Sequence, residues 1–420
     1  MNHVAPKVQD DRARARLSAD PVAYLAACRR EHGDVFTLPL STPVTYVLDA
    51  GAHRAILTSR AVDFAPISRQ SKIRFGLGAL VETDEDVRAL SHVFIRALRG
   101  ATLVETLDRF DAVMRRYTEA FARTLSAERE MTLDALVDAT LVPASVAALF
   151  GEQAVDADLA RDVRDYSVAV AARLTGASPE LKSAGLAASD ALGERFARCI
   201  EGEQTPLVRA LLRDGADAAK RETQVAMVRM LMWGSLVNLS PTASWMAASV
   251  FREPALQDEL ARAEDGEGTA LVGSVVLETL RLYSRPNMYR AVRESFDVTL
   301  RDGERVRLEA GSWVALFPRF AHLDGEAFQA PETFVPARFV DADEPSRLRR
   351  PGASMLVFGM GKGRCPGDRY ATEVLERTLL TWTRSLRGAL VKGELPSPVK
   401  QTVASTPAPS QPILTRIQSR

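Results

Sequence analysis

Hydrophobic positions recur at helical spacing through most of the middle of the chain. From about residue 84 to residue 284, Ala, Leu and Val alternate with Glu and Arg so that the apolar positions share one face of a helix. Clear examples are the stretches 86–100, 103–125 and 224–254. The last stretch is strongly apolar and carries few charges, so we predict that it runs through the core. Helices should therefore dominate the fold.

Short runs with β-type patterning lie outside this helical region. One of them contains Asp302-Gly303, a pair typical of a hairpin turn. The Pro-rich segment 330–351 predicts an extended connection, and the tail after Lys392 predicts loop or edge strand. We therefore expect small, peripheral sheets built from the β-like runs 34–40, 45–50 and 297–317.

The composition is that of a globular protein with a large core. The chain has 420 residues, of which 46% are hydrophobic and 26% charged, and no compositional seam divides it. We predict a single domain, 1–420, and a monomer. The 54 basic residues balance the 54 acidic ones, so no net field favours nucleic acid or an anionic membrane. The polar N-terminal stretch lacks the apolar run of a signal peptide or membrane anchor, so we expect a cytoplasmic protein.

Three cysteines show neither disulfide nor zinc-site spacing. Cys28 and Cys199 lie in helical patterns, where a cysteine usually serves as a small apolar residue. Cys365 differs, because it follows a loop rich in glycine and precedes a helical pattern that begins at Asp368. Such a loop allows close backbone approach to a bulky group, and the positive end of the helix favours a thiolate. Cys365 is therefore suited to binding a metal.

A glycine-rich loop can also hold a phosphate, or be a turn with an incidental cysteine. A phosphate loop ends in Gly-Lys-Ser/Thr, whereas Lys362 is followed by Gly363. The run Phe358-Gly-Met-Gly-Lys-Gly-Arg-Cys-Pro-Gly367 instead resembles the haem-binding loop of cytochromes P450, F-x-x-G-x-x-x-C-x-G.

This resemblance implies that Cys365 ligates the iron of haem b. It also implies that Phe358 packs near the thiolate and that Gly361 and Gly367 allow the tight loop. Thiolate ligation is what lets the iron of this family cleave an O–O bond. The implied fold is mainly α: a triangular helical domain with a small β region, with haem between the central helix and the Cys365 loop.

A second resemblance involves Glu278-Thr-Leu-Arg281, which is similar to the family's E-x-x-R motif. The spacing puts both charges on one helix face, although such a pair by itself is more often solvated. Arg338, in a segment similar to the family's P-E-R-F element, would complete a buried Glu–Arg–Arg triad. The resemblance implies a structural role for the triad, behind the haem.

The resemblance also suggests partners for the haem propionates. Arg290 lies where the family often places a propionate-binding arginine, and a surface arginine is the less favoured alternative. Gly363 stands two positions before the cysteine, where many relatives carry His or Arg. His92 and Arg96 are candidate replacements for that contact.

The central helix departs from the usual oxygen-activating signature, in which an acid and a threonine relay protons. The counterpart here is Gly234-Ser-Leu-Val-Asn238, so Val237 replaces the acid and Asn238 the threonine. Pro241 is expected to bend or break the helix. This run resembles the subset that includes bile-acid-forming sterol 7α/12α-hydroxylases and prostacyclin synthase.

Several functions remain open at this point. A monooxygenase would use dioxygen and electrons from a ferredoxin or flavodoxin with its reductase, with Asn238, Thr242 or water assisting protonation. An isomerase, dehydratase or peroxygenase would act on a peroxide without electrons. A non-catalytic haem carrier or gas sensor is a third alternative. We favour the monooxygenase, because most of the family hydroxylates.

The expected substrate is a small hydrophobic molecule, lipid-like or a natural product of secondary metabolism. Its pocket would be formed by the loop 64–81, by Ser235 and Asn238 of the central helix, and by Asn287 and Met288. These residues mix apolar and polar groups, as ligand pockets do.

Overall fold

The computed structural model describes residues 5–74, 81–125, 127–175, 179–214, 221–264, 267–284, 286–349, 352, 355–400 and 406–420. The predicted mainly helical fold with small sheets is confirmed. The helices are α1 (Ala13–Ala19), α2 (Pro21–His32), α3 (Ala50–Thr58), α4 (Ala65–Arg74), α5 (Asp84–Ala97), α6 (Gly100–Arg123), α7 (Leu133–Ala139), α8 (Leu141–Phe150), α9 (Leu159–Thr175), α10 (Pro179–Glu201), α11 (Pro206–Asp214), α12 (Arg221–Phe251), α13 (Pro254–Ala261), α14 (Glu267–Tyr283), α15 (Arg319–His322) and α16 (Asp368–Ser385), with short 3-10 turns η2 (Glu152–Ala154) and η4 (Gly361–Gly363).

The strands form three small sheets. The five-stranded sheet has the order β1-β2-β8-β5-β3, in which only the β2–β8 pair is parallel. The other two sheets have the orders β4-β10-β9 and β6-β7. The strands are β1 (Val35–Leu38), β2 (Val44–Val47), β3 (Val62–Asp63), β4 (Arg129–Thr132), β5 (Met288–Val292), β6 (Phe296–Thr299), β7 (Arg305–Leu308), β8 (Trp313–Leu316), β9 (Leu386–Leu390) and β10 (Leu414–Ser419).

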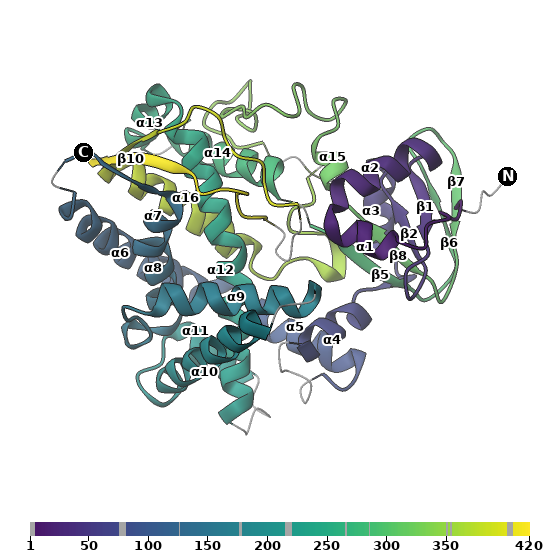
Figure 1. The fold of residues 1–420 in the computed structure, drawn as a ribbon, viewed down its shortest axis with the longest axis horizontal. Coiled ribbons are helices and arrows are strands. Elements are labelled where there is room, and N and C mark those ends of the chain that lie inside the picture. The colour runs from purple at the N-terminus through teal and green to yellow at the C-terminus, as the bar shows by residue number, and fades with distance from the viewer. Residues whose placement is uncertain are drawn as a thin grey trace.

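The elements divide into a sheet-containing part and a helical part (Figure 1). The five-stranded sheet and α1, α2 and α3 lie on the right of the view, near the N-terminus. The larger group of helices lies on the left, with α12 running down its middle. α12 packs against both α14 and α16, so the central helix lies beside the helix that follows the cysteine loop.

Of the two outcomes expected at Pro241, a bend or a break in the central helix α12, the structure excludes the break. The helix runs without interruption from Arg221 to Phe251, with Pro241 inside it. Proline removes one backbone hydrogen bond from a helix. Every residue from Thr242 to Phe251 is buried, and this packing holds the second half of the helix in place despite the lost bond.

The β predictions are partly right. The hairpin at Asp302-Gly303 is confirmed, because β6 and β7 pair on either side of it and Gly303 has a φ of +87°. The tail, predicted as loop or edge strand, instead supplies the middle strand β10 of its sheet. The reason is that Ile417 is buried and β10 pairs with β4 on one side and β9 on the other.

One apolar helical stretch among the described residues, Leu133–Phe150, is long enough to cross a membrane by length and composition. It is 78% buried inside the protein. A core helix passes the same test, so the stretch is weak evidence for a membrane span.

Candidate active site

The loop before Cys365 is held by one backbone hydrogen bond and two left-handed glycines. The Cys365 N–H donates to the Phe358 carbonyl oxygen at 2.8 Å, which closes the loop. Gly359 and Gly361 have φ values of +71° and +66°, a region that favours glycine. A Cβ at Gly361 would also collide with the Leu57 carbonyl oxygen at the end of α3. The loop therefore needs glycine at both positions.

The structure corrects one of the two glycine predictions. Gly361 has the predicted role, but Gly367 has a φ of −97°, which any residue adopts. A Cβ at Gly367 would meet only Leu98 Cδ1, at an ordinary 3.8 Å. Gly359 is the glycine that the motif did not single out. Gly359 is required because its φ is positive, and the sequence alone does not show the sign of φ.

Cys365 is exposed as a residue, but neighbouring protein atoms exclude much of the water around its sulfur. This burial raises the pKa of the thiol, while the Gly367 backbone N–H, which donates to the sulfur, opposes the rise. Cys365 also stands three residues before the N-terminus of α16, whose dipole favours negative charge. A metal cation that binds this thiol displaces its proton.

A buried arginine lies beside the loop. Arg290 is 6% exposed, and one guanidinium nitrogen, Nη1, donates to the Tyr289 carbonyl oxygen at 2.8 Å. The other terminal nitrogen, Nη2, is buried and has no hydrogen-bond partner among the described residues. Burial lowers the pKa of Arg290 to about 10. A Cβ at Gly363 would come within 2.5 Å of Nη2, so the glycine makes room for this guanidinium.

The two alternative propionate partners lie on the exposed face of one helix. His92 and Arg96 are one turn apart on α5, and both are exposed. The opposite face of α5 is buried, which includes Val93 and Phe94. Their predicted role toward a propionate stays a prediction.

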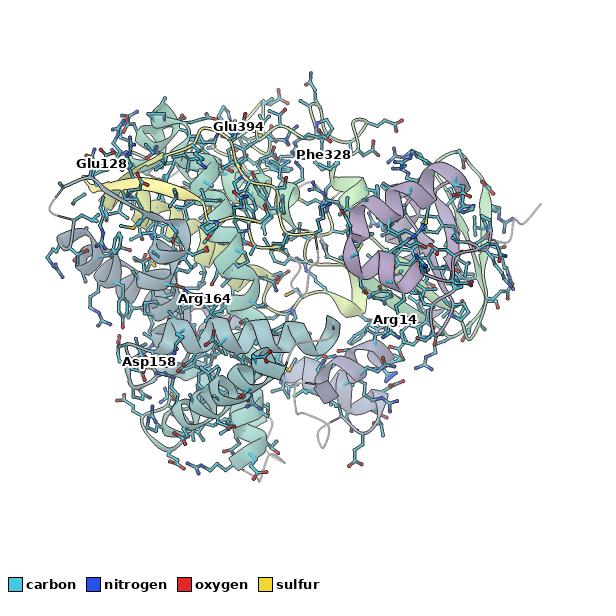
Figure 2. The ribbon with its side chains drawn as sticks, in the orientation of Figure 1. Arg14, Glu128, Asp158, Arg164, Phe328 and Glu394 are labelled. Carbon is cyan, nitrogen blue, oxygen red and sulfur yellow. The ribbon has the colours of Figure 1, made fainter. Side chains whose placement is uncertain are left out.

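The three charges of the predicted triad lie together. Glu278 and Arg281 are fully buried, and the Arg281 guanidinium makes two hydrogen bonds to the Glu278 carboxylate, at 2.7 and 2.8 Å. Arg338 Nε donates to the same carboxylate at 2.9 Å. The ring of Phe328, labelled in Figure 2, lies under the Arg281 guanidinium at 5.1 Å. Removing one partner of a buried ion pair costs about 3–5 kcal/mol.

The arginines of the triad also hold a strained turn. Ala330 has a φ of +46°, a left-handed value that is rare outside glycine. Its carbonyl oxygen accepts a hydrogen bond from Arg338 Nη2 at 3.1 Å, and the Pro331 carbonyl accepts one from Arg281 Nη1 at 2.5 Å. These charge-assisted bonds offset the strain.

On the central helix, the polar residues bind the C-terminal tail. The Asn238 side-chain oxygen accepts a hydrogen bond from the Thr406 backbone N–H at 3.3 Å. The single hydroxyl proton of Thr242 is shared between the Asn238 carbonyl oxygen, at 2.6 Å, and the Thr406 hydroxyl, at 3.0 Å. Thr406 is also 3.1 Å from the Ser284 hydroxyl. Thr242, predicted to be catalytic, is only 2% exposed and is bound within the protein.

This network fixes the orientation of the Asn238 amide. A backbone N–H can only donate, so the amide oxygen of Asn238 is the atom that faces Thr406. The amide nitrogen, with two donor hydrogens, is therefore not the atom that binds Thr406. Asn238 can therefore donate hydrogen bonds at this point of α12, but it cannot release a proton as an acid does. Sequence reasoning missed Thr406 and Ser284, because no local signal ties them to a helix so distant in sequence.

The predicted substrate-contacting residues are only partly brought together. Met288, in β5, lies beside the cysteine loop, with its terminal methyl 3.7 Å from the position of a Cβ on Gly359. Asn287 is exposed and donates to the Tyr289 hydroxyl at 2.8 Å. The Ser235 hydroxyl is bound to the Leu231 and Met232 carbonyls of its own helix. In the loop 64–81, residues 75–80 lie outside the described residues.

A polar cavity of about 1150 Å³ lies apart from these residues, between α2, α15 and the β6–β7 hairpin. Arg29, Asp49, Arg301 and Asp324 are among the residues that line it. It includes none of the catalytic, cofactor-binding or substrate residues predicted from the sequence, and charged groups of both signs line it. We assign it no role.

Comparison with known proteins identifies a family and several relatives. The family described as "Cytochrome P450" matches residues 207–412. The chain is 23% identical to cytochrome P450 7B1 of Mus musculus over 402 residues, which cover 86% of this chain and 79% of that protein. It is 20% identical to the cholesterol 7-alpha-monooxygenase of Cricetulus griseus, over 91% of this chain and 86% of that protein. A human 7-alpha-hydroxycholest-4-en-3-one 12-alpha-hydroxylase is 26% identical over 40% of this chain and 39% of that protein.

The chain belongs to the cytochrome P450 family, and it is an enzyme of that monooxygenase family. The family's cofactor is haem bound through a cysteine thiolate. The residues present fit this group on two observations. Cys365 is exposed at the end of a loop that needs glycine at two positions, and Arg290 presents a buried guanidinium nitrogen with no hydrogen-bond partner among the described residues. We take Cys365 as the proposed iron ligand and Arg290 as the proposed propionate partner.

Proposed function

We propose that this enzyme inserts one oxygen atom from dioxygen into a C–H bond of a hydrophobic, sterol-like or other lipid-like substrate. Electrons would come from a separate ferredoxin or flavodoxin with its reductase. The observation that carries the proposal is the similarity to the cholesterol 7-alpha-monooxygenase of Cricetulus griseus, which extends over 91% of this chain. It includes the Asn238 segment of α12.

The bound haem would supply the oxidising chemistry. The chain's own contribution is to hold that group and to position donors next to the substrate. Cys365 would bind the iron and Arg290 a propionate, while the Glu278 triad would keep the loop region rigid. The Asn238 amide nitrogen would donate a hydrogen bond to an oxygen atom of the substrate or of an ordered water. Because an amide is not an acid, the proton itself would come from water.

Rearrangement of a peroxide is the second candidate, because α12 lacks both the acid and the alcohol of the usual relay at positions 237 and 238. Such a reaction needs neither electrons nor delivered protons. Asn238 would then hydrogen-bond the peroxide oxygen instead. The two candidates differ in the source of the product oxygen.

Isotopically labelled dioxygen separates the two candidates. The haem-loaded enzyme would be incubated with sterols, fatty acids and their hydroperoxides, with and without an electron-transfer pair and NADPH. We expect products that carry one labelled oxygen atom and form only with the electron donor. Product from a hydroperoxide without label and without donor would overturn the monooxygenase. A Cys365→Ala variant that kept the ferrous–CO spectrum and activity would overturn the haem-thiolate site itself.

A further inference from the structure

Lys72 is a lysine that is almost fully buried, on α4. Its exposed fraction is 6%, and its ammonium donates to the Ser68 hydroxyl one turn earlier, at 2.6 Å. Buried lysines are rare unless an anion pairs with them, because removing a charge from water is costly. A serine hydroxyl is neutral, so it does not balance this charge.

Three acidic residues of the neighbouring elements β3 and α5 are already bound, and the fourth, Glu85, is exposed. Asp63 accepts from Arg88 at 2.9 Å, and Asp84 accepts from Arg293 at 2.6 Å. Asp86 caps the N-terminus of its own helix, α5. Among the described residues Lys72 has no carboxylate partner, and the stretch 75–80 (FGLGAL) contains no acidic residue.

The position of α4 connects Lys72 with the site at Cys365. α4 packs against α5 and against β5, the strand that carries Arg290 (Figure 1). Phe64, the residue before α4, has its Cβ 3.3 Å from the position of a Cβ on Gly363. Two elements in contact, α4 and β5, thus each bury a cation with no carboxylate bound to it. Burial also lowers the pKa of Lys72 to about 8, so the amine still holds its proton at neutral pH.

We propose that Lys72 is a carboxylate-binding residue whose anion is brought by a bound molecule, not by the polypeptide. Two molecules could supply that carboxylate. One is the haem, whose second propionate lacks the usual partner because position 363 is glycine. The other is a substrate with a carboxylic acid at one end, such as an acidic sterol or a fatty acid. This second source rests on the proposed function.

The test uses the haem-loaded full chain and three substitutions. Lys72→Met removes the charge and keeps the length of the side chain, and Lys72→Arg keeps the charge. Lys392→Met, at an exposed lysine, is the matched control. The first measurement is the rate of haem transfer to excess apomyoglobin. The second is a titration of the Soret band with 5β-cholanic acid and hexadecanoic acid, each beside its methyl ester.

Each source predicts a different result. If a propionate binds Lys72, Lys72→Met should lose haem faster, on the order of tenfold or more, and bind acid and ester with unchanged preference. If the substrate supplies the carboxylate, haem transfer should be unchanged. The affinity for the acids, but not for the esters, should then fall by a similar factor. Lys72→Arg should restore much of the loss in either case.

The proposal is overturned if Lys72→Met behaves like Lys392→Met in both measurements. That outcome would leave the monooxygenase proposal intact, because labelled oxygen would still enter a neutral substrate. The converse result is that Lys72→Met loses haem faster while the enzyme incorporates no labelled oxygen into any substrate. That result would support the carboxylate site at Lys72 and overturn the proposed monooxygenase reaction.

Discussion

A single buried histidine connects the Glu278–Arg281 pair with the cysteine loop. The His322 carbonyl oxygen accepts a hydrogen bond from Arg281 Nη1 at 2.7 Å. The ring atom Nε2 accepts one from the Leu356 backbone N–H at 3.1 Å, two residues before the loop begins at Phe358. Because Nε2 accepts, the proton of the neutral ring is on Nδ1. The ion pair and the loop are therefore held by the same residue.

His322 should make the stability of the protein depend on pH. Burial lowers its pKa to about 3, from an ordinary value of 6.5. Between about pH 6.5 and pH 3 this histidine is protonated in the unfolded chain but not in the folded one. The free energy of unfolding therefore falls as the pH drops through this range. The slope is roughly 1.4 kcal/mol per pH unit. His53, with a pKa lowered by burial to about 4, acts in the same direction.

We expect the His322→Gln variant to lose this dependence in part, because glutamine can accept from Leu356 but does not titrate. The measurement is the free energy of unfolding in urea at pH 7.5 and pH 5. His32→Gln, at a half-buried histidine, serves as control. If the free energy of unfolding drops from pH 7.5 to pH 5 by the same amount in His322→Gln as in the control, His322 is not the source of the pH dependence.

At the scale of elements, the geometry of the cysteine loop predicts that alanine substitution of two glycines of one motif has different effects on haem binding. Gly361→Ala places a Cβ against the Leu57 carbonyl oxygen at a φ of +66°, so η4 must move away from α3. Gly367→Ala adds a methyl group in an ordinary backbone conformation. We expect the first variant to lose most of its haem and the second to keep it.

The haem content of the purified proteins and their ferrous–CO spectra measure this difference. Both substitutions add the same methyl group within one loop, so each controls for the other. Equal haem content in the two variants would show that the contact between η4 and α3 does not hold the loop in place.

Sequence patterns predicted those elements whose signal is local. The helical stretches 86–100 and 103–125 correspond to α5 and α6, and Asp302-Gly303 gave the β6–β7 hairpin. The role of β10 was missed because its partners, β4 and β9, are set by distant pairing. Thr406 was missed for the same reason, since its contacts to α12 span more than 160 residues. Motif spacing singled out Cys365 and brought the triad residues to notice, whereas Lys72 is singled out only by its burial in the structure.

At the scale of the whole molecule, the protein contains buried positive charge that its own acids do not neutralise. Arg281 and Arg338 share the single Glu278 carboxylate, whereas Arg290 and Lys72 have no carboxylate bound to them among the described residues, and Asp63 acts on Arg290 only at longer range. Desolvated charge of this kind costs stability unless a bound anion compensates it. The haem-free chain should therefore be destabilised by this desolvation cost, and the haem-loaded enzyme should not be.

This cost predicts that one substitution changes the free energy of unfolding in opposite directions in the haem-free and the haem-loaded protein. Arg290→Met keeps the approximate length of the side chain but removes the buried guanidinium. In the haem-free chain the substitution should leave stability unchanged or raise it by about 1 kcal/mol or more, because an unpaired buried charge disappears. In the haem-loaded enzyme it should lower stability by about 2 kcal/mol or more, because the propionate loses its partner. Unfolding in guanidinium chloride, followed for both proteins with and without haem, gives the four free energies. A loss of stability of the same size in both states would mean that Arg290 stabilises the polypeptide itself. Its Nη2 atom would then not be a binding site for a propionate.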